Sequence, residues 1–180
     1  MRLRPSDPPA ATLALVAAVA LEEVVSHHLN PDLCRGRLVL KWPNDLLLDG
    51  AKLSGILLER ADEAVVIGFG VNLAHHPANT DRLATSLLAW GASVEPASFL
   101  EMLAETFARW LSRWRQEGIR PVRDRWLERA HPAGSALTAR LPDGNSVEGL
   151  FERLDVDGAL ILRLASGERR VIHAGDVFLI

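Results

Sequence analysis

The spacing of apolar residues along the first half of the chain indicates one helix followed by several strands. From Ala10 to Leu21 apolar residues recur at helical spacing, which predicts a packed helix that ends around residues 27–30. The spacing then shortens to that of strands, and the turn Asp49-Gly50 is typical of a tight hairpin. The predicted strands are residues 37–42, 46–48, 52–60 and 64–73, and the nearly unbroken apolar run of the last predicts burial on both faces.

The second half of the chain begins with a polar segment and continues with two helices. Residues 74–82 show no periodicity and predict a mobile loop. Helices are expected from about Pro96 to Gln116 and from Arg120 to Arg129. In the longer helix, tryptophan and arginine interleave as in surfaces that stack nucleic-acid bases. A core stripe with a salt-bridged outer face explains the same pattern and is favoured; the stripe is Phe99, Leu103, Phe107, Trp110 and Trp114, and the outer charges are Glu101, Glu105, Arg109 and Arg113.

The pattern changes again near Gly134, where short alternating segments and closely spaced turn residues begin. Pro142-Asp143-Gly144-Asn145, Asp157-Gly158 and Ser166-Gly167 predict four or five antiparallel strands in a small barrel or sandwich. The chain is therefore expected to divide into an α/β (α+β) domain over residues 1–133 and a small β domain over residues 134–180.

Composition narrows the range of functions. The 180 residues are 48% apolar and 24% charged, which suits a folded core, and a net charge of −3 gives no support for binding nucleic acid or an anionic membrane. No apolar stretch is expected to span a membrane, and the N-terminal run is read as a packed helix rather than a signal peptide. Cys34 is the only cysteine, which excludes an intrachain disulfide and suits a cytoplasmic protein; a catalytic role for Cys34 is disfavoured.

Lysine is scarce and clustered. Of the 20 lysine and arginine residues, 18 are arginine, and the two lysines are Lys41 and Lys52. The predicted hairpin brings Asn44, Asp45 and Lys52 to one end of a sheet. An amide, a carboxylate and a compact ammonium group together suit a site for phosphate and Mg²⁺, although each residue alone is ordinary turn or surface chemistry.

Two further patterns allow more than one interpretation. Gly68, Gly70 and Asn72 alternate on one face of a predicted strand, which leaves either a flat floor for a ligand or room for another element to pack. The segment is not a dinucleotide fingerprint because it lacks the third glycine and opens no helix. His75-His76 could bind a metal ion, but no third ligand is in view and a solvated loop is favoured.

Four motifs together resemble the biotin–protein ligase family. Residues 41–45 match its KWPND motif and residues 52–57 its KxxGIL motif. Residues 68–72 match its GxGxN strand and residues 84–87 its ATSL motif, and residues 134–180 are similar to its Src-homology-3-like C-terminal domain. The resemblance implies a catalytic domain akin to class II aminoacyl-tRNA synthetases.

The same resemblance implies an activity and a set of site residues. A family member activates biotin with ATP and Mg²⁺ as biotinyl-adenylate, then transfers the biotin to a lysine of the biotin carboxyl carrier protein of acetyl-CoA carboxylase. Lys52 would be the catalytic residue, contacting the biotin carboxylate and the α-phosphate, and residues 74–82 would order over the adenylate. Gly55, Gly68 and Gly70 would line the biotin side, whereas Lys41, Asn44, Asp45 and Asn72 would bind ATP, with Asp45 also a Mg²⁺ ligand.

One departure from the family pattern limits the expected activity. The family's GRGRxGR biotin loop lies upstream of every motif matched here, and Met1 to Pro5 resembles the end of the strand that follows it. Arg35-Gly36-Arg37 is not a substitute, because it stands where the family has only a connecting turn. We therefore expect the chain alone to make little or no biotinyl-adenylate. Two alternatives stay open: a lipoate-type acyl-adenylating ligase, and a non-enzymatic remnant that binds a carrier protein or partner subunit. A homodimer is also allowed, whereas no DNA-binding segment supports a repressor role.

Overall fold

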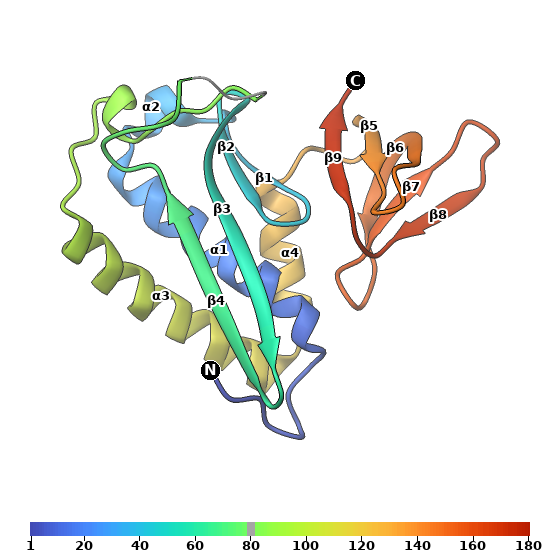
Figure 1. Ribbon diagram of the computed structural model, residues 1–180, viewed down its shortest axis with the longest axis horizontal. Helices are drawn as coiled ribbons and strands as arrows, with labels where there is room; N and C mark the ends of the chain where they lie inside the picture. The colour runs from blue at the N-terminus through green and yellow to red at the C-terminus, as the bar shows by residue number, and fades with distance from the viewer. Residues whose placement is uncertain (79–81) are drawn as a thin grey trace.

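The computed structural model describes residues 1–78 and 82–180, and it leaves the side chains of Leu33 and Cys34 undescribed. Its first part is an antiparallel sheet in the order β1-β2-β3-β4, covered on one face by helices (Figure 1). The elements of this part are η1 (Ala10–Thr12), α1 (Leu13–His28), α2 (Pro31–Cys34), β1 (Leu38–Lys41), β2 (Asp45–Leu48), β3 (Ala51–Ala61), β4 (Ala64–Val71), η2 (Leu88–Trp90), α3 (Pro96–Glu117) and α4 (Arg120–Arg129).

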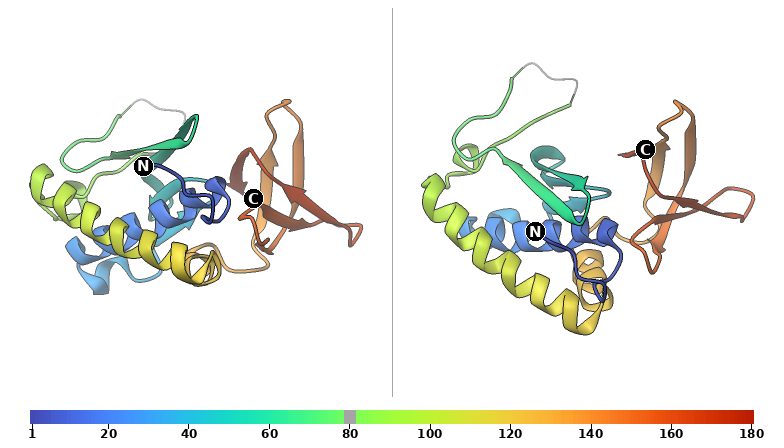
Figure 2. Two further views of the ribbon diagram at one scale, coloured as in Figure 1. Left: turned by 90° about the horizontal axis from the view of Figure 1, so that it is seen from below. Right: turned by 60° about the horizontal axis from the view of Figure 1, so that its bottom comes forward.

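Helix α1 forms the centre of the core in this part. It contacts β1, β2 and β3 on one side and α3 and α4 on the other, so that it lies between the sheet and the outer helices (Figure 2). Eleven of its residues are buried, and the buried Glu22 accepts ion pairs from Arg125 and Arg129 of α4. The stripe predicted for α3 is confirmed, with Phe99, Leu103, Trp110 and Trp114 buried. Its outer arginines pair differently from expectation: Arg109 with Glu23 of α1 and Arg113 with Glu117.

The second part is a five-stranded antiparallel sheet in the order β8-β7-β6-β5-β9. It lies beside the first sheet, with β9 nearest to it (Figure 1). Three turns that contain glycine reverse the chain at the positions predicted from sequence, and all three glycines, Gly144, Gly158 and Gly167, have positive φ. The strands are β5 (Ala136–Arg140), β6 (Ser146–Leu154), β7 (Leu160–Arg163), β8 (Arg169–Ile172) and β9 (Asp176–Leu179).

Contacts other than charge pairs join the two parts. The indole nitrogen of Trp42 donates to the carbonyl of Gly158 at 3.1 Å, and Arg123 donates to the carbonyl of Asp155 at 3.3 Å. Leu15 of α1 packs so closely against Gly158 that a Cβ added there would lie 3.1 Å from it. These contacts hold the second part against α1, α4 and the turn after β1.

One expectation from sequence, the burial of the fourth strand, is wrong, whereas the packed N-terminal helix is found as expected. Strand β4 is not buried on both faces, because Val66, Gly68 and Gly70 are exposed while Val65 on the opposite face is buried against the helices. The stretch Ala10–His28 is, by length and composition, apolar enough to cross a membrane, with a mean hydropathy of 1.5 over 18 residues. Because 67% of that window is buried inside the fold, it is the core helix of this structure.

Candidate active site

The backbone of Lys52 is held on both sides. On one side Lys52 pairs with Leu47 of β2. On the other, its N–H donates to the carbonyl of Leu83 at 2.8 Å, and its carbonyl accepts from the N–H of Thr85 at 3.0 Å. The segment that carries the ATSL motif therefore extends the sheet locally beside Lys52 and fixes where its side chain starts.

The ammonium of Lys52 reaches Asp45, as does that of Lys41. Asp45 Oδ1 lies 2.6 Å from Lys52 Nζ, and Asp45 Oδ2 lies 3.1 Å from Lys41 Nζ. Asp45 and Lys41 are only 5% and 8% exposed, whereas the Lys52 side chain is 40% exposed. The two lysines that sequence singled out are therefore brought to one carboxylate, and Lys52 is the more accessible of the pair.

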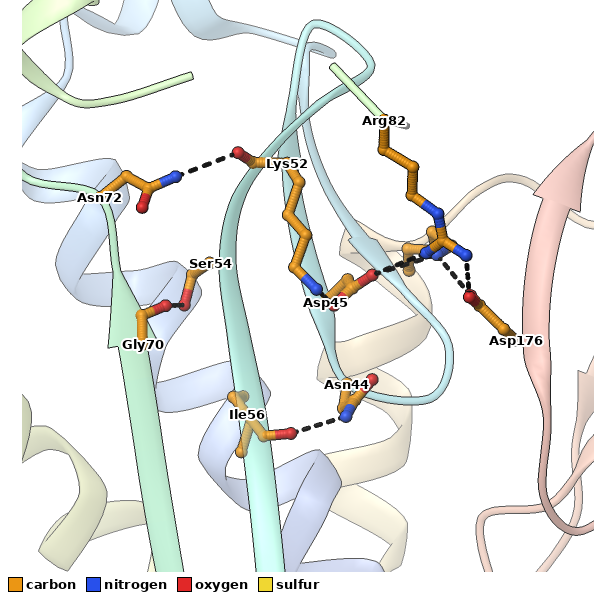
Figure 3. Close-up of polar contacts among 10 residues, drawn as sticks. Asn44, Asp45, Lys52, Ser54, Ile56, Gly70, Asn72, Arg82 and Asp176 are labelled. Carbon is orange, nitrogen blue, oxygen red and sulfur yellow. Dashed lines mark hydrogen bonds and ion pairs between the residues drawn. The ribbon is translucent and has the colours of Figure 1, made fainter. Parts of the chain in front are cut away.

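Two residues that sequence reasoning missed complete this cluster. Asp176, at the start of β9, accepts from Lys41 Nζ at 2.9 Å and also pairs with Arg82 (Figure 3). Arg82 in turn approaches Asp45, with 3.9 Å between its guanidinium and Oδ2. We refer to Lys41, Asp45, Lys52, Arg82 and Asp176 as the charged cluster. No local motif marks Asp176, because its contacts exist only once the second sheet is docked.

The cluster changes the acidity of Asp176. Its partial burial alone would raise its pKa, but hydrogen bonds from Arg82 and Lys41 and the positive charges of both outweigh that effect, so the pKa lies below its ordinary value. Asp176 is therefore charged at neutral pH. With three cations and two carboxylates, the cluster keeps an excess of one positive charge.

The side-chain amide nitrogens of Asn44 and Asn72 donate hydrogen bonds to backbone carbonyls of this protein. Asn44 Nδ2 donates to the carbonyl of Ile56 at 2.6 Å, and Asn72 Nδ2 donates to the carbonyl of Lys52 at 3.4 Å (Figure 3). Asn72 Nδ2 also donates to the carbonyl of Thr85 at 2.9 Å. Both residues thereby fix the strand that carries Lys52. Asn72 Nδ2 has both hydrogens engaged, whereas Asn44 keeps one N–H and its side-chain oxygen for a ligand.

The three motif glycines lie next to Lys52 on the outer face of the sheet, away from the helices. Gly55 pairs with Gly70, and Leu57 pairs with Gly68, so all of these positions share that face. A Cβ at Gly55 would lie 3.1 Å from Lys52 Nζ, whereas a Cβ at Gly68 or Gly70 would meet nothing closer than 3.7 Å. Among the described residues, then, no other element packs closely over Gly68 or Gly70, and we call this surface the glycine floor.

Lys52 lies where three cavities meet. One of about 510 Å³ extends over the glycine floor, and one of about 900 Å³ extends past Ser54 toward Asn72. A third, of about 290 Å³, lies between the two sheets beside the charged cluster and is walled by apolar residues, among them Leu47, Leu83, Leu137 and Val177. An elongated ligand with a charged centre could therefore lie with its two ends in different cavities and its centre at Lys52.

A protein-bound metal is not evident in the described part of the chain, which contains no group of three histidine, cysteine or acidic side chains able to hold one. His76 contacts the hydroxyl of Ser86 at 3.1 Å, as expected for an ordinary loop histidine. Both oxygens of Asp45 hold lysine ammonium groups, so this carboxylate is already neutralised without a metal. Residues 79–81 of the predicted adenylate loop, and the side chain of Cys34, lie outside the described residues.

The two-part fold is that of a biotin or lipoate protein ligase, as comparisons with known proteins show. Residues 3–128 match the family model of the biotin/lipoate A/B protein ligase family, and residues 134–180 match that of the biotin protein ligase C-terminal domain. The chain belongs to the biotin protein ligase family. The fold class predicted from sequence is thereby confirmed.

Individual relatives support the same conclusion. A biotin–[acetyl-CoA-carboxylase] ligase of Paracoccus denitrificans is 42% identical over 94% of this chain and 73% of its own length. One of Mycobacterium tuberculosis is 38% identical over 77% of this chain, and the match spans about half (52%) of its length. A biotin protein ligase from Aquifex aeolicus, solved with biotin and ATP, has the same fold, with a TM-score of 0.81 at 19% identity over 100% of this chain and 76% of its own.

Proposed function

We propose that this protein activates biotin with MgATP and transfers it to a lysine of a biotin carboxyl carrier protein, with Lys52 as the catalytic residue. The observation that carries the proposal is the position of the Lys52 ammonium, fixed beside Asp45 at the point where three cavities meet. The names of the curated relatives supply the substrates.

In the first step, an oxygen of the biotin carboxylate attacks the α-phosphorus of ATP, the bond to the bridging oxygen breaks, and pyrophosphate leaves. Two anions must approach each other in this step, so a positive charge held between them lowers the barrier. Lys52 supplies that charge. Its contact with Asp45 keeps the ammonium in place before the substrates bind, which limits the reorganisation needed during the reaction.

In the second step, the amine of the carrier lysine attacks the carbonyl carbon of biotinyl-adenylate, the bond to the phosphate oxygen breaks so that AMP leaves, and the nitrogen loses a proton to water as the amide forms. The amine must arrive uncharged, and the leaving phosphate gains negative charge. Lys52 and Lys41 are the cations nearest to that charge, so both would stabilise AMP as it departs.

The other predicted site residues divide between the two ends of the substrate. Gly55, Gly68 and Gly70 would let biotin approach the backbone of β3 and β4. Asn44, Asp45, Asn72 and Lys41 would serve ATP, the two asparagines through side-chain atoms that their internal hydrogen bonds do not use. Mg²⁺ would enter with ATP as part of the substrate. Asp45 could bind it only if one of its two ion pairs, with Lys41 or with Lys52, were broken.

We further propose that residues 1–133 form the catalytic domain and residues 134–180 the small C-terminal domain. The family models support this division because one match ends at residue 128 and the other begins at residue 134. Cytoplasmic localisation, a homodimer and the identity of the carrier stay predictions.

Biotin-dependent exchange of pyrophosphate into ATP tests the first step. The chain is assayed alone and with whatever part of the Paracoccus relative precedes the aligned region fused before Met1, because the sequence contains no GRGRxGR loop. We expect exchange in the fusion and much weaker exchange in the chain alone. Exchange that depends on lipoate instead would favour the lipoate alternative, and no exchange in either form would contradict the proposal.

A further inference from the structure

Strand β9 presents two side chains to the nucleotide end of the proposed site. Asp176 and Phe178 stand two residues apart, so they share one face of the strand. Asp176 pairs with both Lys41 and Arg82. The ring of Phe178 lies against the same two cations, with its centroid 5.7 Å from Lys41 Nζ and 4.6 Å from the centre of the Arg82 guanidinium.

We infer that Asp176 is a positioning residue that acts through Lys41 and Arg82, holding both cations at the site where the phosphates of ATP bind. This inference rests on the proposed function, which assigns that end of the site to ATP. It gives the C-terminal domain a part in the first half-reaction, because the carboxylate comes from β9 while the cations come from β1 and the segment after residue 81.

The backbone before Asp176 is built to place this carboxylate. Gly175 has a φ of +150°, and a Cβ there would lie 2.6 Å from the carbonyl oxygen of Arg140. Only glycine fits at that position, so β9 can begin directly beside β5 with Asp176 as its first residue. Asp176 is then paired in register with Arg140.

A purely structural role, in which Asp176 attaches one domain to the other, explains less. The domains are already joined by Trp42 to Gly158, by Arg123 to Asp155 and by Leu15 against Gly158. None of these contacts involves the charged cluster. Removing the Asp176 charge should therefore leave the domains docked and disturb the cations locally.

The first test measures the rate at which trypsin cleaves after Arg82 in the full 180-residue chain. In the wild-type protein Asp176 holds the Arg82 guanidinium that trypsin must bind, so Asp176→Asn should speed this cleavage roughly five- to tenfold. Asp176→Glu should restore most of the protection. Glu168→Gln, which removes an exposed charge from the β7–β8 turn, is the matched control and should leave the rate unchanged.

The second test is the dissociation constant of MgATP, measured by titration calorimetry on the same proteins. Asp176→Asn adds one positive charge near the phosphates, so a charge effect alone would tighten binding. Loss of positioning predicts the opposite, a roughly tenfold weaker binding, with partial rescue by Asp176→Glu. Unchanged melting temperatures would show that the variants are folded.

The outcomes separate the two claims. Unchanged tryptic cleavage in Asp176→Asn, or tighter MgATP binding, would overturn the positioning role. If neither the wild-type chain nor the fusion described above binds MgATP, the proposed function fails, and the cleavage rates alone then decide whether Asp176 holds Arg82.

Discussion

On the outer face of the first sheet, charged side chains from both sheets pack around Asp45, whereas directly beside them three glycines present no side chains. The charged cluster is built before any substrate arrives, with nitrogen–oxygen distances of 2.6 to 3.1 Å around its lysines. The glycine floor has open space above Gly68 and Gly70, and its neighbours Leu57 and Val66 are 60% and 56% exposed.

Because of this difference, substitutions in the two regions should have different effects on stability and on binding. A change in the charged cluster disturbs interactions that hold the protein together, so it should affect both folding and chemistry. A change at Gly68 or Gly70 meets no neighbour closer than 3.7 Å, so it should affect only what binds there. The substitutions below test that separation, from the largest expected effect to the smallest.

Asp45→Asn should have the largest effect on stability. It leaves the buried ammonium of Lys41 with one carboxylate partner fewer and removes the close partner of Lys52. Breaking a buried ion pair from one side costs about 3 kcal/mol, which urea unfolding would measure. Asp49→Asn is the matched control, because Asp49 forms only an exposed pair with Arg37 at 3.7 Å and should cost under about 0.5 kcal/mol. Similar losses in both variants would contradict the buried role of Asp45.

Lys52→Arg should have the largest effect on chemistry. The charge is kept, but a planar guanidinium cannot occupy the space of a compact ammonium that lies 3.1 Å from the Cβ position of Gly55. We expect the rate of biotin-dependent pyrophosphate exchange, measured in the fusion with the Paracoccus segment, to fall roughly 100-fold. Arg37→Lys, at an exposed pair, serves as the control. Near-normal exchange in Lys52→Arg would show that any cation suffices at this position.

Gly55→Ala and Gly70→Ala test the border between the two regions. At Gly55 the new methyl group displaces the Lys52 ammonium, so kcat for exchange should fall about tenfold. At Gly70 the methyl group makes only an ordinary contact, 3.7 Å from the carbonyl oxygen of Gly55, so the KM for biotin should rise several-fold while kcat stays close to normal. Equal kcat losses in both variants would mean that the glycine floor and the charged cluster are one functional unit.

The smallest expected effect is a pH dependence of stability at the edge of the charged cluster. Burial, and to a lesser extent the charge of Lys41, lower the pKa of His131 below the ordinary value of 6.5. The unfolded chain therefore binds this proton more readily, so the contribution of His131 is present above pH 6.5 and is lost as the pH falls through the folded-state pKa. Unfolding free energies at pH 7.5 and 5.5 should differ less in His131→Gln than in the wild type. An identical difference in both proteins would show that His131 does not contribute to the pH dependence of stability.

Sequence predicted the elements of the first part well, because their periodicity is local. Helix α4 has the predicted bounds, and the hairpin around Asp49-Gly50 brings Asp45 and Lys52 together as expected. The exposure of β4 could not be predicted, since an apolar run does not say what covers it. Likewise, no spacing along the chain reveals that Asp176 meets Lys41, because that contact depends on how two separately folded sheets dock. The structural use of Asn72 was hidden for the same reason: its acceptor at Thr85 belongs to another segment.

A crystal structure with a non-hydrolysable biotinyl-adenylate analogue, in which a sulfamoyl group replaces the phosphate, would test the central claim most directly. The claim is that Lys52 acts at the meeting point of the glycine floor and the charged cluster. We expect the sulfamoyl group within hydrogen-bonding distance of Lys52 Nζ, the biotin chain over Gly55 and Gly70, and the adenosine toward Asn72. An analogue bound elsewhere, with Lys52 still paired to Asp45 and out of contact with the ligand, would contradict it.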